Sequence, residues 1–213
     1  MKSKKKYSYY DLDSVIDKSN FQKEIYLPSS FWKNAAEKIK IELEYGGIEN
    51  FRNLETCLGF FVPNYGIPAN SFNKDISTDI YNLLDEKGSL KQSLAMKTFL
   101  SGYLQALSDY RTFISSQSNN GNLNTIDFSE CNFGNPVEQF DFDGKKYSRS
   151  ALNYLLGLCF LKQNLQENDE IKTVLEIGGG FGTLGEILNF SNGVKYINVD
   201  IPPISFISWS YLK

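Results

Sequence analysis

The sequence predicts an α/β protein in which a mainly helical region, residues 1–135, precedes the start of a parallel sheet in residues 136–213. Two observations support this prediction. In the first half, apolar residues recur at the three- and four-residue spacing of helices. In the second half, an apolar run, five glycines within eight residues, a short amphipathic segment and another apolar run follow one another. This order is typical of a strand–helix–strand unit.

The N-terminal region is expected to contain four helices. The clearest covers residues 30–46, where Ser29 or Ser30 caps the start and Gly46 and Gly47 end the helix. The other three are expected over residues 47–61, 74–87 and 89–116.

A polar stretch and a small hairpin connect the two regions. Residues 117–136 are rich in Asn, Ser and Gly and are expected to form a long loop. Residues 137–148 (VEQFDFDGKKYS) predict a hairpin, because an Asp-Gly pair stands between two short apolar runs. Ser148 is then expected to cap a helix over about residues 149–165.

The strand–helix–strand unit begins at residues 172–177 (KTVLEI), a β-branched, apolar run that is typical of a strand buried on both faces. The following helix has Leu184 and Leu188 on its apolar side, and a second buried strand (VKYINVD) ends at Asp200. Ligands of open α/β sheets bind outside the carboxyl ends of the strands. We therefore expect the glycine turn and Asp200 to face one site.

Composition excludes several classes of partner. A net charge of −3 gives no basis for binding nucleic acid or an anionic membrane. The longest apolar stretch, residues 151–161, is far shorter than the roughly 20 residues of a membrane-spanning helix. The basic start (KSKKK) leads into a polar segment and not into the apolar core of a secretion signal. We therefore predict a cytoplasmic protein without a membrane span.

The cysteine and histidine content limits the chemistry of the chain. Cys57, Cys131 and Cys159 share no CxxC spacing, which favours reduced thiols over a disulfide or a zinc site, and we predict no bound metal. The sequence has no histidine. Ser–His and Cys–His pairs are therefore excluded, and any general base within the chain is a carboxylate.

Two cofactors compete for the glycine turn. Residues 180–185 satisfy the GxGxxG pattern of dinucleotide-binding proteins, and Asp200 lies about where a ribose-binding acid belongs. However, Glu176 stands at the tip of the first strand, two positions before Gly178. Its carboxylate would face the pyrophosphate of NAD at short range, and the two negative charges would repel each other.

S-adenosylmethionine (SAM) avoids this conflict, because it has no phosphate. Its sulfonium and ammonium groups would be attracted to Glu176, and Asp200 can accept hydrogen bonds from both ribose hydroxyls. The glycines let the backbone approach the ligand closely. We therefore favour SAM as the cofactor, and an NAD-linked oxidoreductase stays open as an alternative.

The segment VLEIGGGFGTLGEIL followed by YINVDIPP resembles motif I and the next acidic motif of class I SAM-dependent methyltransferases. The E-x-G-x-G-x-G pattern and the second acid are matched by Glu176, Gly178, Gly180, Gly182 and Asp200. The chain is more similar still to bacterial putative sugar O-methyltransferases, in IGGGFGTLGEIL, DIPP, DGKKYSRSALNYLLGL and ENFRN. The resemblance implies the first βαβ unit of a Rossmann-like sheet and methylation of a sugar hydroxyl in surface-polysaccharide biosynthesis.

The resemblance also implies roles for single residues. Glu176 would lie near the methionyl end of the cofactor, and the three glycines of the pattern would form its backbone bed. Asp200 would hold the ribose hydroxyls, and Ile201 would lie against the adenine.

Residues on the substrate side are expected just before the first strand of the sheet. Tyr147, Ser148 and Asn153 are placed there to meet the cofactor or a small-molecule or glycan substrate. The candidate carboxylate bases near the hairpin are Glu138, Asp141 and Asp143. We assign no catalytic residue, because the base is expected outside this chain.

The resemblance implies a sheet of seven strands, of which this chain supplies two. A long unpaired strand edge is an aggregation hazard that proteins normally cover. We therefore expect an incomplete polypeptide, the N-terminal portion of a longer enzyme, with weak or absent catalysis of its own. The alternative from another class is a non-catalytic fragment or binding module that keeps its helical surface for a partner.

Overall fold

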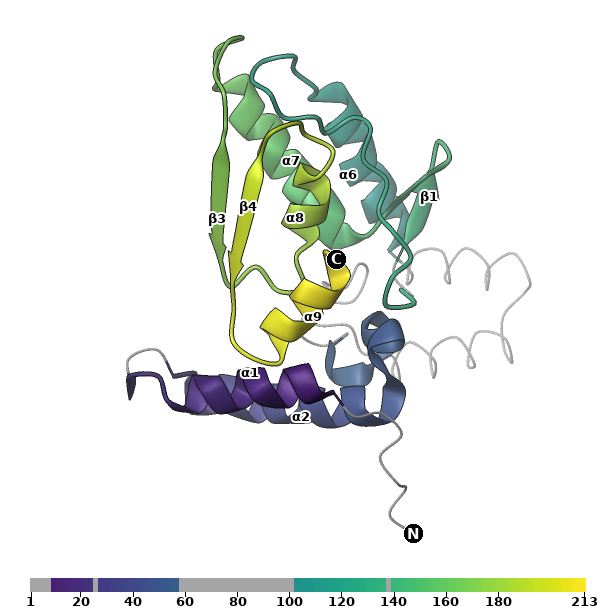
Figure 1. Cartoon of the computed structure of the whole chain (residues 1–213). Helices are drawn as coiled ribbons and strands as arrows, with labels where there is room; N and C mark the ends of the chain where they lie inside the picture. The colour runs from purple at the N-terminus through teal and green to yellow at the C-terminus, as the bar shows by residue number, and fades with distance from the viewer. Residues whose placement is uncertain (1–8, 25–26, 58–101, 137–138) are drawn as a thin grey trace, which may run out of the picture.

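The computed structural model describes residues 9–24, 27–57, 102–136 and 139–213. Within these residues it contains helices and two small two-stranded sheets. Figure 1 shows a lower layer of N-terminal helices and, above it, a parallel sheet with helices packed on one side. The α/β class that the sequence predicts is therefore confirmed at this level.

The lower layer consists of α1 (Tyr10–Asn20), α2 (Ser30–Gly46) and the short 3₁₀ helix η2 (Ile48–Asn53). Helix α2 has the predicted bounds, and Gly47, with φ at 86°, ends it in a backbone conformation that favours glycine. Helix α1 was not predicted, because it carries few apolar residues. Its buried residue Leu12 belongs to a core formed with residues far along the chain.

Three expected helices fall only partly, or not at all, on the described residues. Over 47–57 the structure has η2 and three further helical residues, 55–57. Of the helix expected over 89–116, the described part is α6 (Tyr103–Ser115). The helix expected over 74–87 lies outside the described residues.

The middle of the chain forms the predicted hairpin and helix. Strands β1 (Phe140–Phe142) and β2 (Lys145–Tyr147) pair antiparallel. The two turn residues, Asp143 and Gly144, have φ at 53° and 77°, as a two-residue hairpin turn requires. Helix α7 (Arg149–Gln163) follows, and the predicted loop over 117–136 contains no helix or strand.

The C-terminal part forms the predicted strand–helix–strand unit and a further helix. Strands β3 (Thr173–Ile177) and β4 (Lys195–Val199) are parallel and are connected by α8 (Thr183–Leu188). Helix α9 (Ile204–Tyr211) follows β4 and packs against the N-terminal layer (Figure 1).

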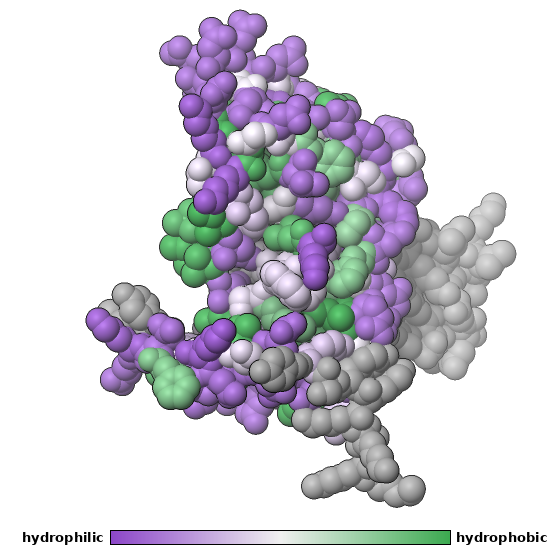
Figure 2. All heavy atoms as spheres, viewed as in Figure 1, coloured by the Kyte–Doolittle hydropathy of each residue, from purple (hydrophilic) through white to green (hydrophobic). Residues whose placement is uncertain are grey.

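One face of the β3–β4 sheet is covered and the other is open. Val174 and Tyr196 pack against the core that contains α7 and α8. On the opposite face, the side chains of Leu175 and Ile177 are 60% and 80% exposed, and Figure 2 shows hydrophobic side chains gathered on this side of the molecule. The prediction that both faces are buried is therefore wrong for the described part of the chain. The helices that pack on the sheet there all lie on one side (Figure 1).

Two hydrophobic cores cross the predicted boundary at residue 135. The first joins α6 and the loop after it to the hairpin, α7 and α8. The second joins α1, α2 and η2 to Phe181 in the glycine turn and to α9. Residues from both predicted regions are therefore packed together in each core.

Candidate functional site

The glycine turn lies directly after β3, at the carboxyl end of the sheet. Its start is tied to the second strand, because the N–H of Gly178 donates to the carbonyl of Val199 at 2.8 Å. Gly178, Gly180 and Gly182 have φ at 75°, 59° and 99°. These values lie in the left-handed region, which glycine adopts without steric cost. A Cβ at Gly178 would meet nothing within 4 Å, so the turn leaves open space in front of the strand.

Gly179 is a fourth constrained position, which the E-x-G-x-G-x-G pattern does not include. A Cβ at this residue would stand 2.5 Å from Glu176 Oε2 and 2.6 Å from Asn198 Oδ1. Any other residue here would therefore have to displace these side chains or the turn. Sequence reasoning missed this role, because it depends on which side chains lie behind the turn.

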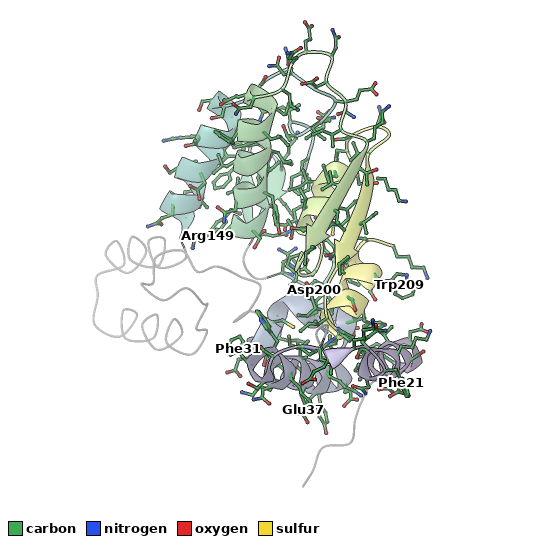
Figure 3. All side chains as sticks on the ribbon, turned by 90° about the vertical axis from the view of Figure 1, so that its left-hand side faces the viewer. Phe21, Phe31, Glu37, Arg149, Asp200 and Trp209 are labelled. Atoms are coloured by element: carbon green, nitrogen blue, oxygen red, sulfur yellow. The ribbon has the colours of Figure 1, made fainter. Side chains whose placement is uncertain are left out.

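Asp200 is bound to the turn by its carboxylate. Oδ2 accepts from the N–H of Gly180 at 2.9 Å, and Oδ1 accepts from the N–H of Ile201 at 2.7 Å. Burial raises the pKa of Asp200, the nearby charge of Glu176 adds to this, and the two backbone hydrogen bonds oppose it. Figure 3 places Asp200 at the end of β4, between the sheet and the α1–α2 layer. Ile201 is half-buried and packs against the second core.

Glu176 points to the helix-covered face of the sheet, where two tyrosines bind it. The hydroxyl of Tyr154 on α7 donates to Oε1 at 2.7 Å, and that of Tyr196 on β4 donates to Oε2 at 2.5 Å. Burial raises the pKa of both tyrosines, and the hydrogen bonds to Glu176 raise it further. Both hydroxyls therefore remain protonated donors at physiological pH. Neither tyrosine was a predicted site residue, since the contact joins segments about 20 residues apart.

Asn198 lies opposite Glu176 in the parallel register. Its Nδ2 donates to Ser208 Oγ at 2.9 Å and to the carbonyl of Gly180 at 3.2 Å. Its Oδ1 is buried and accepts no hydrogen bond in the structure. The region behind the turn is therefore rich in acceptor oxygens.

Phe181, inside the glycine turn, connects the turn to the N-terminal part. Its ring packs edge-on against Phe51 of η2 and Tyr211 of α9, with centroids 5.2 and 5.1 Å away. The guanidinium of Arg52 lies 5.1 Å from the centre of the same ring. The ENFRN segment thus supports the turn from below.

Two of the three predicted substrate residues are buried in the described structure. Tyr147 and Ser148 are each only 1% exposed. The hydroxyl of Ser148 accepts from the N–H of Ala151, as an N-cap, and donates to Glu130. Asn153 lies on the exposed side of α7. Their placement gives no support to a substrate role, which stays a prediction.

The candidate bases near the hairpin are involved in turn contacts. Asp141 accepts from the N–H of Gly144 at 3.2 Å, and Asp143 accepts from the hydroxyl of Tyr110 at 2.7 Å. Glu138 lies outside the described residues. Across the described part of the chain, no group of three or more Cys, Asp or Glu side chains is placed to hold a metal ion. None of the helices described there is both long and apolar enough to cross a bilayer.

Comparisons with known proteins leave the chain without an assigned relative. No family model, no curated protein and no solved structure matches it. Inference about function therefore depends on the sequence and on the geometry of the turn.

Proposed function

We propose that this chain is part of a SAM-dependent methyltransferase and that its glycine turn binds the cofactor. The observation that carries the proposal is the charge of the turn. Two carboxylates, Glu176 and Asp200, flank it, and the N–H of Gly180 donates to Asp200. A site of this kind attracts a cationic ligand that carries hydroxyl donors.

The same geometry argues against a dinucleotide. The N–H groups of Gly178, Gly180 and Gly182 all donate to acceptors of the protein itself, namely Val199, Asp200 and Gly179. A diphosphate would have to replace these bonds and would also lie close to the Glu176 carboxylate.

The residues of the turn fit the parts of SAM. The left-handed glycines and the open space at Gly178 admit a ligand close to the backbone. Each carboxylate oxygen of Asp200 accepts one backbone hydrogen bond and keeps a second lone pair, so the pair can accept the two ribose hydroxyls. Glu176 supplies negative charge near the methionyl end. When bound, the cofactor supplies an electrophilic methyl group.

The acceptor in this proposal is a sugar hydroxyl, in the synthesis of a surface polysaccharide. Support for it comes from the resemblance of residues 143–158 and of the glycine turn to sugar O-methyltransferases. The general base is left unassigned, since Asp141 binds the hairpin turn and Asp143 binds Tyr110 of α6. A cytoplasmic location remains part of the proposal.

Calorimetry on the 213-residue chain tests the cofactor assignment. We expect S-adenosylhomocysteine (SAH) to bind and NAD to give no heat. Asp200→Asn is expected to weaken SAH binding about ten-fold or more, because a charged acceptor of hydrogen bonds is lost. Asp169→Asn is the control, since this exposed carboxylate caps a distant loop.

Other outcomes would identify the alternatives. Binding of NAD without binding of SAH would favour an oxidoreductase. Binding of neither, by a chain that folds, would favour a non-catalytic binding module.

A further inference from the structure

The carboxylate of Glu176 is held by side chains from two different elements. Tyr154 reaches it from α7 and Tyr196 from β4, and each hydroxyl takes a different oxygen, at 2.7 and 2.5 Å. Rotation of the carboxylate is therefore restricted at both oxygens. Because Gly179 leaves no room for a Cβ beside Oε2, the turn lies directly against this fixed charge.

The packing around Tyr196 indicates that its position is built into the fold. A Cβ at Gly185 of α8 would lie 2.5 Å from the Tyr196 ring, so only glycine lets the helix pack this closely on it. Tyr196 also stands opposite Val174 in the register, which places its hydroxyl on the same face as Glu176. The segment GTLGEIL thus makes room for the Tyr196 ring as well as completing the turn.

We propose that Tyr154 and Tyr196 are positioning residues, which hold Glu176 so that its negative charge is directed to the cationic methionyl end of the cofactor. This inference rests on the proposed function. The two hydroxyls orient the carboxylate and leave it a lone pair on each oxygen for the ligand's ammonium group or for a water between them. The carboxylate is then already ordered before the ligand binds. Less conformational entropy is therefore lost on binding, which favours affinity.

Two ligands that differ only at the methionyl end test this role. SAH carries the amino acid group, and 5′-methylthioadenosine has the same nucleoside without it. In titrations of the full 213-residue chain, we expect Tyr154→Phe and Tyr196→Phe each to weaken SAH binding roughly three- to ten-fold. Binding of 5′-methylthioadenosine should change by less than about two-fold, because it does not reach Glu176.

A matched control and a double-mutant cycle separate positioning from general damage. Tyr110→Phe removes the same kind of hydrogen bond, 2.7 Å long, from Asp143 in the hairpin, and neither ligand should be affected. In a Glu176→Gln background, Tyr154→Phe should cause no further loss of SAH affinity, since the charge that it positions is absent. The two tyrosines lie on different elements, so each variant tests the proposal if the other fails to fold.

The outcomes distinguish this inference from the proposed function. Equal losses for both ligands, or no loss for SAH, would overturn the positioning role while SAM binding stands. If the wild-type chain binds neither ligand, the proposed function fails and the positioning role fails with it.

Discussion

At the level of single residues, the glycines of the turn are required for two different reasons. Gly178 is required by its positive φ, whereas Gly179 and Gly185 are required by the side chains behind them. Gly179 adjoins Glu176, and Gly185 adjoins the ring of Tyr196. The sequence shows only that each position is glycine. Why glycine is needed there follows from the residues that surround it in the folded structure.

Gly179→Ala is expected to destabilise the chain by roughly 1 to 3 kcal/mol, because the new methyl group overlaps Glu176 Oε2 and Asn198 Oδ1. Gly157→Ala is the control. Gly157 lies in α7 with nothing within 4 Å of its Cβ position, so alanine there should stabilise the helix by about 0.5 to 1 kcal/mol. Urea unfolding measures both changes. Equal effects of the two variants would contradict the close packing behind the turn.

The raised pKa of Asp200 predicts how ligand binding depends on pH. Burial, the main cause, makes the folded protein hold this proton more tightly than an ordinary aspartate does. As the pH falls, Asp200 therefore becomes protonated, and loses its charge, at a higher pH than an ordinary aspartate does. The affinity for SAH should therefore begin to fall at a pH at which an ordinary aspartate would still be charged. Titrations between pH 7 and pH 4 should show this loss in the wild type, and a loss of the same size at the same pH in Asp200→Asn would contradict the assignment.

At the level of elements, α7 connects the hairpin to the sheet. Its start is fixed by Ser148, whose hydroxyl accepts from Ala151 N–H at 3.1 Å and donates to Glu130 at 2.8 Å. Six residues after the cap, Tyr154 reaches Glu176 on β3. The position of the cap therefore determines which residue of α7 lies beside Glu176 of β3.

Ser148→Ala is expected to cost about 2 kcal/mol of stability, since it removes the N-cap of α7 and one donor to the buried Glu130. Ser115→Ala, on the exposed end of α6, should change the stability by less than about 0.5 kcal/mol. Thermal unfolding followed by circular dichroism compares the two. A stable Ser148→Ala protein that has lost substrate binding would instead support the role predicted from the sequence.

At the level of the whole molecule, a buried ion pair connects the N-terminal part to the loop that precedes the hairpin. Arg52 Nη2 and Glu130 Oε1 are 3.0 Å apart, and their side chains are 1% and 0% exposed. Glu130 also accepts from Ser148 and Gln139, and the Arg52 guanidinium lies over Phe181. The lower layer, the loop, α7 and the glycine turn therefore meet at this pair.

Arg52→Met is expected to destabilise the chain by about 3 to 5 kcal/mol, because it leaves the Glu130 carboxylate buried without its cation. Adding Glu130→Gln should recover part of this loss. Lys40→Met breaks the partly exposed pair with Asp13 and should cost less than about 1 kcal/mol. Chemical unfolding of the wild type and the three variants measures these changes. Similar losses of stability for the buried and the exposed pair would show that the Arg52–Glu130 pair does not hold the N-terminal layer to the rest of the molecule.

The open face of the β3–β4 sheet determines how the isolated chain associates. Four exposed aliphatic side chains line it: Leu175, Ile177, Ile197 and Val199. A patch of this kind favours self-association. Ile177→Lys should therefore reduce light scattering at high concentration with little change in stability, whereas Ile187→Lys, in the core, should unfold the chain. Comparable destabilisation by both would mean that the open face is covered in solution.

The sequence by itself determined the order of the local elements in the second half of the chain. The Asp-Gly turn, the Ser148 cap, the two apolar runs and the glycines between them are each read from neighbouring residues, and the structure confirms the elements they predict. The acid–glycine–acid spacing also located the candidate site, because parallel strands bring their carboxyl ends together.

Tertiary structure alone decided which side chains surround that site. Tyr154 and Tyr196 reach Glu176, and Arg52 reaches Phe181, only after separate elements have packed. Helix α1 is likewise defined by the core it joins and not by its own pattern. Local spacing determines whether a segment becomes a helix or a strand. Contacts between distant segments depend instead on how their surfaces fit together, and the periodicity of the sequence contains no information about that fit.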